Sequence, residues 1–178
     1  VYIVSNAVKY LQDEEVPDTG ADRLTARLAK NEAEGMQFIV KPNQTISNVK
    51  MTVSELKDGQ GNQFAAENVE AFRQYYIDTQ PTSPEYESVS GMIPDALIPL
   101  VYEDLNSVDV EAGKNQGFWI TVTAPKDQPA GVYTGSVTLT YDGGVTEIPV
   151  EVEVWDFELP DEPSFASAYG LWDSNAWK

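Results

Sequence analysis

The side chains of this sequence that could carry out acid–base chemistry are mainly carboxylates. The 178 residues include 29 Asp and Glu against 11 Lys and Arg, and neither His nor Cys. Without these two residue types, a Ser-His-Asp triad, a thiolate nucleophile and metal sites built on His or Cys are excluded. The remaining chemistry is that of carboxylates, Lys, Tyr and Ser, and paired carboxylates are the groups that hydrolyse glycosidic bonds.

Two pairs of carboxylates near the C-terminus are close enough in sequence to be compared with the catalytic pair of a glycosidase. Asp156 and Glu158 are two residues apart on an expected strand, and Asp161 and Glu162 lie in a Pro-bounded segment. Catalytic carboxyls of glycosidases are about 5–5.5 Å or about 6.5–9.5 Å apart across a cleft. Residues i and i+2 on any strand are about 7 Å apart. Because so many acids make such pairs common by chance, we predict no catalytic residue in this chain.

Aromatic side chains are the second set of candidate site residues. Trp119 and Trp155 have the opposite parity to the core residues of their strands, so both are expected on an outer face or at an end of a sheet. Exposed aromatic rings stack on sugar rings, and they also pack against loops or neighbouring domains. The candidate carbohydrate or interdomain contacts are Trp119, Trp155, Tyr75, Tyr76, Tyr86 and Trp172.

Strict alternation of apolar and polar residues predicts the strands that position these side chains. Residues 118–122, 133–141 and 148–154 alternate with period two, and turn residues separate them. No helical period is convincing, so the fold class is all-β, an antiparallel β-sandwich of immunoglobulin-like or jelly-roll-like type. Residues 2–10 are a further strand candidate, and residues 78–96 read as a long loop rich in Pro.

Three residues of the last third predict local features. Tyr133 follows Ala-Gly-Val in a pattern typical of a tyrosine corner, in which the hydroxyl ties a loop to the sheet. Gly135 leaves room for a large neighbour to lie across its strand. Pro149 indicates an edge position or a bulge, since it cannot donate a backbone hydrogen bond.

The sequence changes character after residue 158. Residues 159–163 read Leu-Pro-Asp-Glu-Pro, a stiff acidic connector. Residues 164–172 then resume an apolar, strand-like pattern. We predict a sandwich domain over residues 1–158, followed over residues 159–178 by a connector and a candidate first strand of a (β/α)₈ barrel. The alternatives are an extra sandwich strand or an ordered tail.

Five stretches carry a family resemblance. They read NEAEGMQF (31–38), IPDALIPL (93–100), NQGFWITV (115–122), PAGVYTGSV (129–137) and VWDFELP (154–160). In this order they resemble the N-terminal β-sandwich of glycoside hydrolase family 123 and its bacterial relatives. The resemblance implies a catalytic barrel that follows as partner in the same polypeptide, and an N-acetyl-β-galactosaminide as substrate. The Asp-Glu pair of that barrel would lie beyond Lys178, so no catalytic residue is carried over.

The expected function is therefore that of a non-catalytic accessory domain of a multidomain glycoside hydrolase, which supports the barrel and contributes to its substrate cleft. Two alternatives remain open. One is a carbohydrate-binding module with a Trp/Tyr platform, and the other is an adhesion or spacer domain of a cell-surface protein.

Composition bounds the remaining partners. A net charge of −18 disfavours nucleic acid, and no apolar run is long enough to span a membrane. No cofactor is expected. A structural Ca²⁺ is conceivable at the acid-rich loops 13–15, 58–62 and 103–104, but none has the ligand spacing of a known motif. Secretion or cell-surface display in a bacterium fits the absence of Cys, and a cytoplasmic location stays open.

Overall fold

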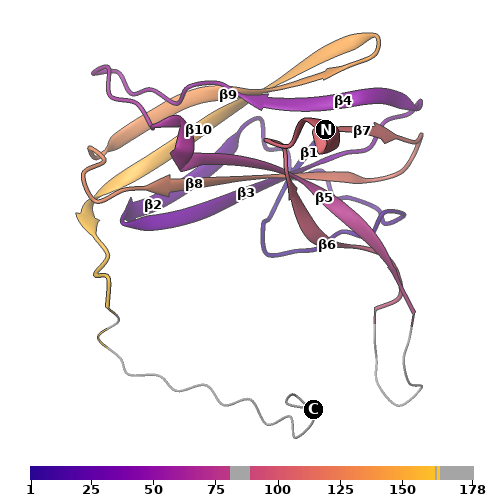
Figure 1. The fold of residues 1–178 in the computed structure, drawn as a ribbon, viewed down its shortest axis with the longest axis horizontal. Helices are drawn as coiled ribbons and strands as arrows, with labels where there is room; N and C mark the ends of the chain where they lie inside the picture. The colour runs from indigo at the N-terminus through magenta and orange to yellow at the C-terminus, as the bar shows by residue number, and fades with distance from the viewer. Residues whose placement is uncertain (81–88, 163, 165–178) are drawn as a thin grey trace, which may run out of the picture.

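The protein is a sandwich of two five-stranded β-sheets (Figure 1). The computed structural model describes residues 1–80, 89–162 and 164. Sheet A has the strand order β1 (Tyr2–Val4), β3 (Glu32–Val40), β8 (Gln116–Ala124), β5 (Val69–Thr79) and β6 (Gly91–Pro99). Sheet B has the order β2 (Leu24–Lys30), β10 (Gly144–Glu158), β9 (Gly131–Tyr141), β4 (Ile46–Val53) and β7 (Ser107–Val110).

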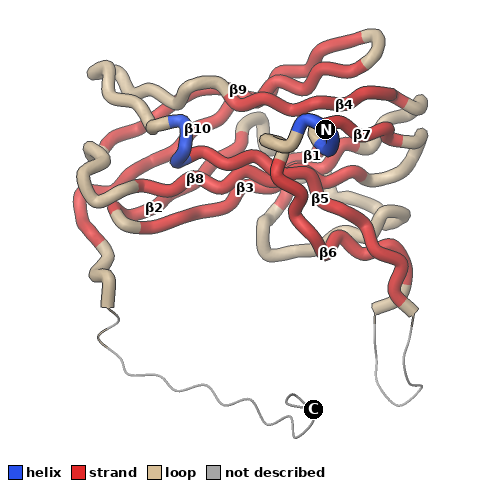
Figure 2. Tube along the Cα trace, in the orientation of Figure 1, coloured by secondary structure: helices blue, strands red, loops and turns tan. Residues whose placement is uncertain are grey.

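Helical structure in the described residues is limited to two single 3₁₀ turns, η1 (Ala66–Asn68) and η2 (Glu103–Leu105), against a background of strands (Figure 2). Neither turn approaches the length of apolar helix that could cross a membrane. The all-β prediction is confirmed for this part of the chain.

The core lies between the two sheets, where the alternating strands place their apolar side chains. In β8 the side chains of Phe118, Ile120 and Val122 are all at most 1% exposed. Phe118 stacks on Phe38 of β3, with ring centroids 5.3 Å apart and planes 15° apart. Sheet B contributes Val150 and its alternating neighbours on β10. The predicted inward parity is confirmed, because a pleated strand presents every second side chain to the same face.

One strand pair departs from the predicted antiparallel arrangement. β10 and β2 pair in parallel, with Val150 opposite Leu24 and Val154 opposite Leu28. The other strand pairs of both sheets are antiparallel. The alternation of a strand reports which side chains face the core, but it does not report the direction of the neighbouring strand. A parallel pair needs only a long connection, and more than a hundred residues separate β2 from β10.

The local predictions for the last third are confirmed. The hydroxyl of Tyr133 donates a hydrogen bond to the carbonyl of Pro129 at 2.7 Å, and its ring meets Phe64 edge-on at 4.8 Å. A Cβ on Gly135 would lie 2.8 Å from Leu56, so this neighbour does lie across the strand. The pairing of β10 with β2 begins at Val150, which leaves Pro149 in the segment that has only β9 as neighbour.

Two loop and strand assignments were wrong. The N-terminal strand ends at Val4 instead of residue 10. The N-terminal segment, residues 5–22, instead crosses the outer face of sheet A, where the amides of Gln37 and Asn115 bind its carbonyls. Tyr10 and Val16 of this segment form a small second core with Ile39.

The predicted loop 78–96 in fact contains the start of a strand. β6 begins at Gly91 and pairs with β5 along the edge of sheet A. An edge strand tolerates Pro94 and Pro99, because their missing N–H groups can face solvent. The predicted barrel strand at 164–172 falls, apart from Ser164, outside the described residues, as do Tyr86 and Trp172.

Candidate functional site at the C-terminal exit

The chain leaves the sandwich at the end of β10 (Figure 1), and two aromatic residues, Trp155 and Phe157, lie among the last residues of this strand. Trp155 and Phe157 alternate outward and stack, with centroids 5.7 Å apart and planes 15° apart. Their exposed fractions are 39% and 52%, although both belong to residue types that folding normally covers. We call these two rings the exit stack. An exposed pair of large aromatic rings is typical of a surface that packs against a partner.

Beside the exit stack, hydrogen bonds hold the connector against the sandwich. The backbone N–H of Leu159 donates to the backbone carbonyl of Lys30 at 2.9 Å. The side-chain amide of Asn31 donates to the Leu159 carbonyl at 2.9 Å and to the Asp161 carboxylate at 3.1 Å. The Lys126 ammonium lies 2.5 Å from Asp161 and 3.3 Å from Glu158. We call Asn31, Lys126, Glu158 and Asp161 the connector clamp.

The position of Asn31 explains why this residue type stands in the clamp. It occupies the turn between β2 and β3 and has a φ of +65°, a left-handed conformation that Asn tolerates better than most residues. Its side chain is therefore presented beside the end of β10. The sequence analysis missed Asn31 and Lys126, because their partners lie 130 and 35 residues further along the chain.

The electrostatics of the clamp disfavour a general-acid role for Asp156 and Asp161. A hydrogen bond from Lys126, then one from Asn31, holds the pKa of Asp161 below its ordinary value. The Lys30 ammonium, 2.8 Å away, likewise lowers the pKa of Asp156. A general acid in a glycosidase needs a raised pKa so that it holds its proton. These two carboxylates instead stay ionised and hold the end of β10.

The clamp should respond to pH at both extremes. Because its folded-state pKa is lowered, Asp161 stabilises the fold above its unfolded pKa, and this contribution is lost as the pH falls through the folded value. The pKa of Lys126 is raised, first by its hydrogen bond to Asp161, so its contribution is present below the unfolded pKa of the lysine and lost as the pH rises through the folded one. We expect the Lys126→Gln variant to return the carboxyl pKa of Asp161 most of the way to its ordinary value.

Carbon-detected NMR of the Asp161 carboxyl measures this pKa directly. Asn31→Gly is the matched control, since Gly accepts the positive φ and removes only the amide donor. It should raise the pKa by less than Lys126→Gln does. An unchanged Asp161 pKa in Lys126→Gln would show that the ion pair does not form in solution.

The other predicted aromatic residues that the structure describes, Trp119, Tyr75 and Tyr76, lie on sheet A. Trp119 is half-buried on the outer face of β8, and its indole N–H donates to Thr121 at 3.1 Å. Tyr75 is 49% exposed and lies under the Arg73 guanidinium. Tyr76 is buried, which raises its pKa to about 12. Among the described residues, the aromatic candidates thus lie on two different sheets and do not form one continuous platform. Their role as carbohydrate or interdomain contacts stays a prediction.

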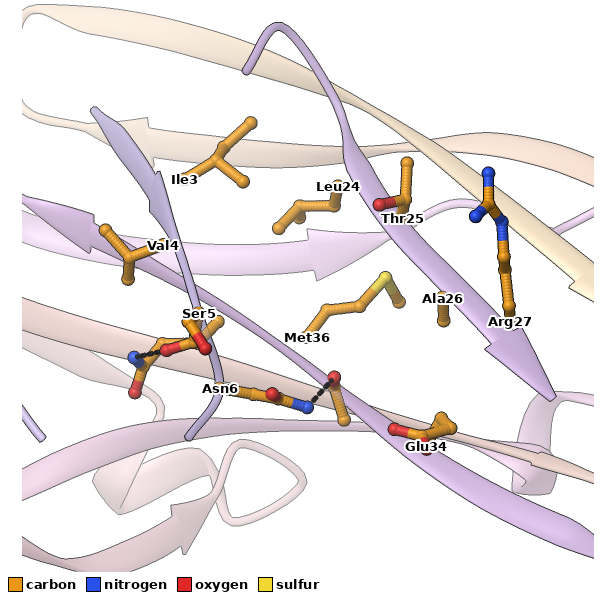
Figure 3. Close-up of a pocket in the computed structure, with 12 residues that line it drawn as sticks. Ile3, Val4, Ser5, Asn6, Leu24, Thr25, Ala26, Arg27, Glu34 and Met36 are labelled. Atoms are coloured by element: carbon orange, nitrogen blue, oxygen red, sulfur yellow. Dashed lines mark hydrogen bonds between the residues drawn. The ribbon is translucent and has the colours of Figure 1, made fainter. Parts of the chain in front are cut away.

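A groove of about 320 Å³ opens at the side of the sandwich, between β1, β2 and β3 (Figure 3). Leu24 and Met36 form its apolar part, and the Asn6 amide donates to the carbonyl of Gly35 at 2.7 Å. Arg27 at its rim pairs with Glu153 at 3.1 Å. Glu34 is the one acid in its lining. This groove therefore lacks the carboxylate pair of a glycosidase site.

Two of the three acid-rich loops, 13–15 and 58–62, place carboxylates in protein contacts. Asp58 accepts hydrogen bonds from the backbone of Gln60 and from the backbone and side chain of Asn62, at 2.7–2.9 Å. Asp13 pairs with Lys114. In the part of the chain that the structure describes, no three acids gather into a group that could hold a metal ion. The geometry adds no support for calcium.

Together, the fold and the exit define a class of protein: a two-sheet β-sandwich domain whose chain leaves one end through a clamped connector. The sequence model of the glycoside hydrolase 123 N-terminal domain matches residues 3–141, and the chain belongs to this family. The family prediction made from the five sequence stretches is confirmed. No curated protein sequence matches the chain.

Solved structures with a similar fold include a family 123 glycoside hydrolase from Clostridium perfringens, whose description concerns the hydrolysis of glycolipid glycans. The two structures superpose with a TM-score of 0.70 and share 17% sequence identity. The match covers 89% of this chain and 27% of the enzyme. The chain thus spans about a quarter of the length of that enzyme. The CooA pilin subunit from enterotoxigenic Escherichia coli is a weaker likeness, with a TM-score of 0.36 at 16% identity, over 78% of this chain and 92% of the pilin.

Proposed function

We propose that this chain is a non-catalytic accessory domain of a multidomain glycoside hydrolase, and that it packs against and orients a catalytic barrel that follows in the same polypeptide. The observation that carries the proposal is the clamped connector beside the exit stack. Membership of the glycoside hydrolase 123 N-terminal domain family supports it.

The clamp gives this role a physical mechanism. Asn31 and Lys126 tie residues 158–161 to both sheets, since Asn31 lies between β2 and β3 and Lys126 follows β8. The first residues of the connector therefore leave the sandwich in a defined direction. A stiff, Pro-containing connector transmits that direction to the next domain. Trp155 and Phe157 supply the apolar surface on which the next domain would pack.

The reaction proposed for the parent protein is hydrolysis of N-acetyl-hexosaminides, with an N-acetyl-β-galactosaminide as the first substrate to test. Family membership supports this assignment, as does the fold shared with the C. perfringens enzyme that hydrolyses glycolipid glycans. The catalytic carboxylates would lie beyond Lys178. A secreted or cell-surface location in a bacterium would suit a parent of this kind.

Removal of the exit stack tests the packing role. In the 178-residue chain, the double change Trp155→Ser and Phe157→Ser should lower the free energy of unfolding by less than about 2 kcal/mol, because both rings are partly exposed. In the longer polypeptide the loss should be greater by about 2 kcal/mol or more, since buried aromatic anchors carry much of the energy of an interface. Thermal unfolding of both polypeptides measures the difference.

Val145→Ser is the matched control, because Val145 is 66% exposed at the other end of the same strand. Its effect should be equally small in both polypeptides. An equal loss for the exit-stack variant in the short and the long polypeptide would contradict the packing role, and would favour an adhesion or spacer domain with no fixed neighbour.

A further inference from the structure

A cleft of about 250 Å³ lies on the outer face of sheet A, between the N-terminal segment and β6. Trp119, Gln37 and Gln74 line it from the sheet. Asn6 and Lys9 line it from the N-terminal segment, and Asp95 lines it from β6. This volume is below the range of about 300–1,000 Å³ that drug-sized ligands occupy, so the cleft has room for a single small ring.

The aromatic wall of the cleft is held rigidly in place. A Cβ on Gly35 would lie only 2.2 Å from Cζ2 of Trp119, so the indole packs directly on the backbone of β3. Its N–H group donates to Thr121 on the same strand at 3.1 Å. The indole ring is therefore held on one face by the backbone of Gly35 and at its N–H edge by Thr121. A rigid aromatic surface loses little conformational entropy when a ligand stacks on it.

The polar floor of the cleft contains an acceptor without a partner. The Gln37 amide donates to the carbonyls of Ser5 and Val8 at 2.9 and 3.0 Å, so its oxygen must face Gln74. It accepts from the Gln74 amide at 2.5 Å. This leaves the Gln74 oxygen without a hydrogen-bond donor among the described residues, although Gln74 is only 6% exposed. Buried amides are rarely left in this state, and the oxygen lies against the backbone of Gly117, where a Cβ would overlap it.

The mouth of the cleft presents a donor and an acceptor side by side. The ammonium of Lys9 lies 2.9 Å from the carboxylate of Asp95, and both side chains are exposed. Asp95 is the extra residue of a β-bulge, because Tyr75 pairs with Ala96 while Tyr76 pairs with Pro94. Bulges re-aim side chains in this manner. Two vicinal hydroxyls can bind such a pair, one donating to the carboxylate and the other accepting from the ammonium.

We propose that this cleft binds one neutral pyranose ring, with the C–H face of the sugar stacked on Trp119 and two of its hydroxyls on Lys9 and Asp95. The net charge of −18 disfavours an anionic ligand. A purely apolar ligand would remove water from the exposed Lys9–Asp95 pair without offering either group a new hydrogen bond. The site is independent of the proposed catalytic partner, so it is tested on the 178-residue chain alone.

The test is an NMR titration of the ¹⁵N-labelled chain with the methyl β-glycosides of galactose, glucose and N-acetylgalactosamine. The reporter is the indole N–H signal of Trp119, assigned by its loss in Trp119→Phe. At least one glycoside should shift this signal saturably, with a dissociation constant on the order of 1–10 mM, the range open to a ligand of one ring. The indole signal of Trp155, on the other sheet, should not move.

Three variants of the cleft and one control variant separate the site from the fold. Trp119→Ala should abolish binding, and Asp95→Asn should weaken it at least about tenfold while the shape is kept. Gly35→Ala should also abolish binding, because the new Cβ displaces the indole. Trp155→Phe should bind as the unchanged chain does. In Trp119→Ala, which lacks the indole reporter, affinity is read from the backbone amide signals of Lys9 and Ala96, which also line the cleft. The proposal is overturned if none of the glycosides shifts the Trp119 indole signal saturably, or if these amide signals show the same affinity in Trp119→Ala, with the amide spectrum showing that each variant is folded.

Discussion

Hydrolysis of a chromogenic N-acetyl-β-galactosaminide should require the longer polypeptide, in which a catalytic domain follows this chain, and the 178-residue chain should leave the substrate intact. Glycosidase chemistry needs one carboxyl that keeps its proton and a second that stays ionised. Asp156 at the end of β10 and Asp161 in the connector are one member of each carboxylate pair considered in the sequence. Both have lowered pKa values and are bound to lysines.

The expected difference is large, because enzymes accelerate their reactions by about 10⁶-fold or more. Release of the chromophore by the two polypeptides at equal molar concentration measures it. A second pair of reactions with Asp156→Asn and Asp161→Asn in the short chain gives the control, since neither change should affect a background rate. If the 178-residue chain hydrolysed the substrate and either substitution abolished this activity, the accessory role would be contradicted. The catalytic residues would then lie at the end of β10.

Phe118→Ala should lower the free energy of unfolding by about 3–5 kcal/mol. Phe118 is 1% exposed and stacks on the fully buried ring of Phe38, so its removal leaves a cavity between the two sheets. Single domains are stable by only about 5–15 kcal/mol, so this single change removes a large part of the total. Urea denaturation measures the loss, with an unchanged dependence on denaturant if the unfolded state is not altered.

Val145→Ala is the surface control for this experiment, and its effect should stay within about 0.5 kcal/mol. The comparison tests the position of the core. If Phe118→Ala lost less than about 1 kcal/mol, the face of β8 that carries Phe118 would not be the one packed between the sheets. The outward parity of Trp119, and with it the sugar cleft, would then be wrong as well.

The faces of the strands could be predicted because burial follows a local rule. Phe118 and Val150 are separated by 32 residues, yet each was placed in the core from its immediate neighbours alone, since successive side chains of a strand point to opposite faces. The tyrosine corner was predictable for the same reason. The hydroxyl of Tyr133 reaches the carbonyl of Pro129, only four residues away.

The exposure of the aromatic candidates was predictable only in part. Tyr76 was proposed as a contact residue, yet it is buried, on the same side of β5 as the buried Gln74. Residue parity identifies a face of the sheet. It does not show whether another part of the chain covers that face.

The family, the all-β class and the inward side chains could be inferred from the sequence, because they depend on local motifs and on the period of two along each strand. Tertiary structure alone decided the parallel pairing of β2 with β10, the connector clamp and the cleft at Trp119. Each of these depends on residues that are distant in the chain, such as Asn31 with Asp161 or Lys9 with Asp95. Such contacts are selected by the packing of the whole sandwich, and no local pattern of residues encodes them.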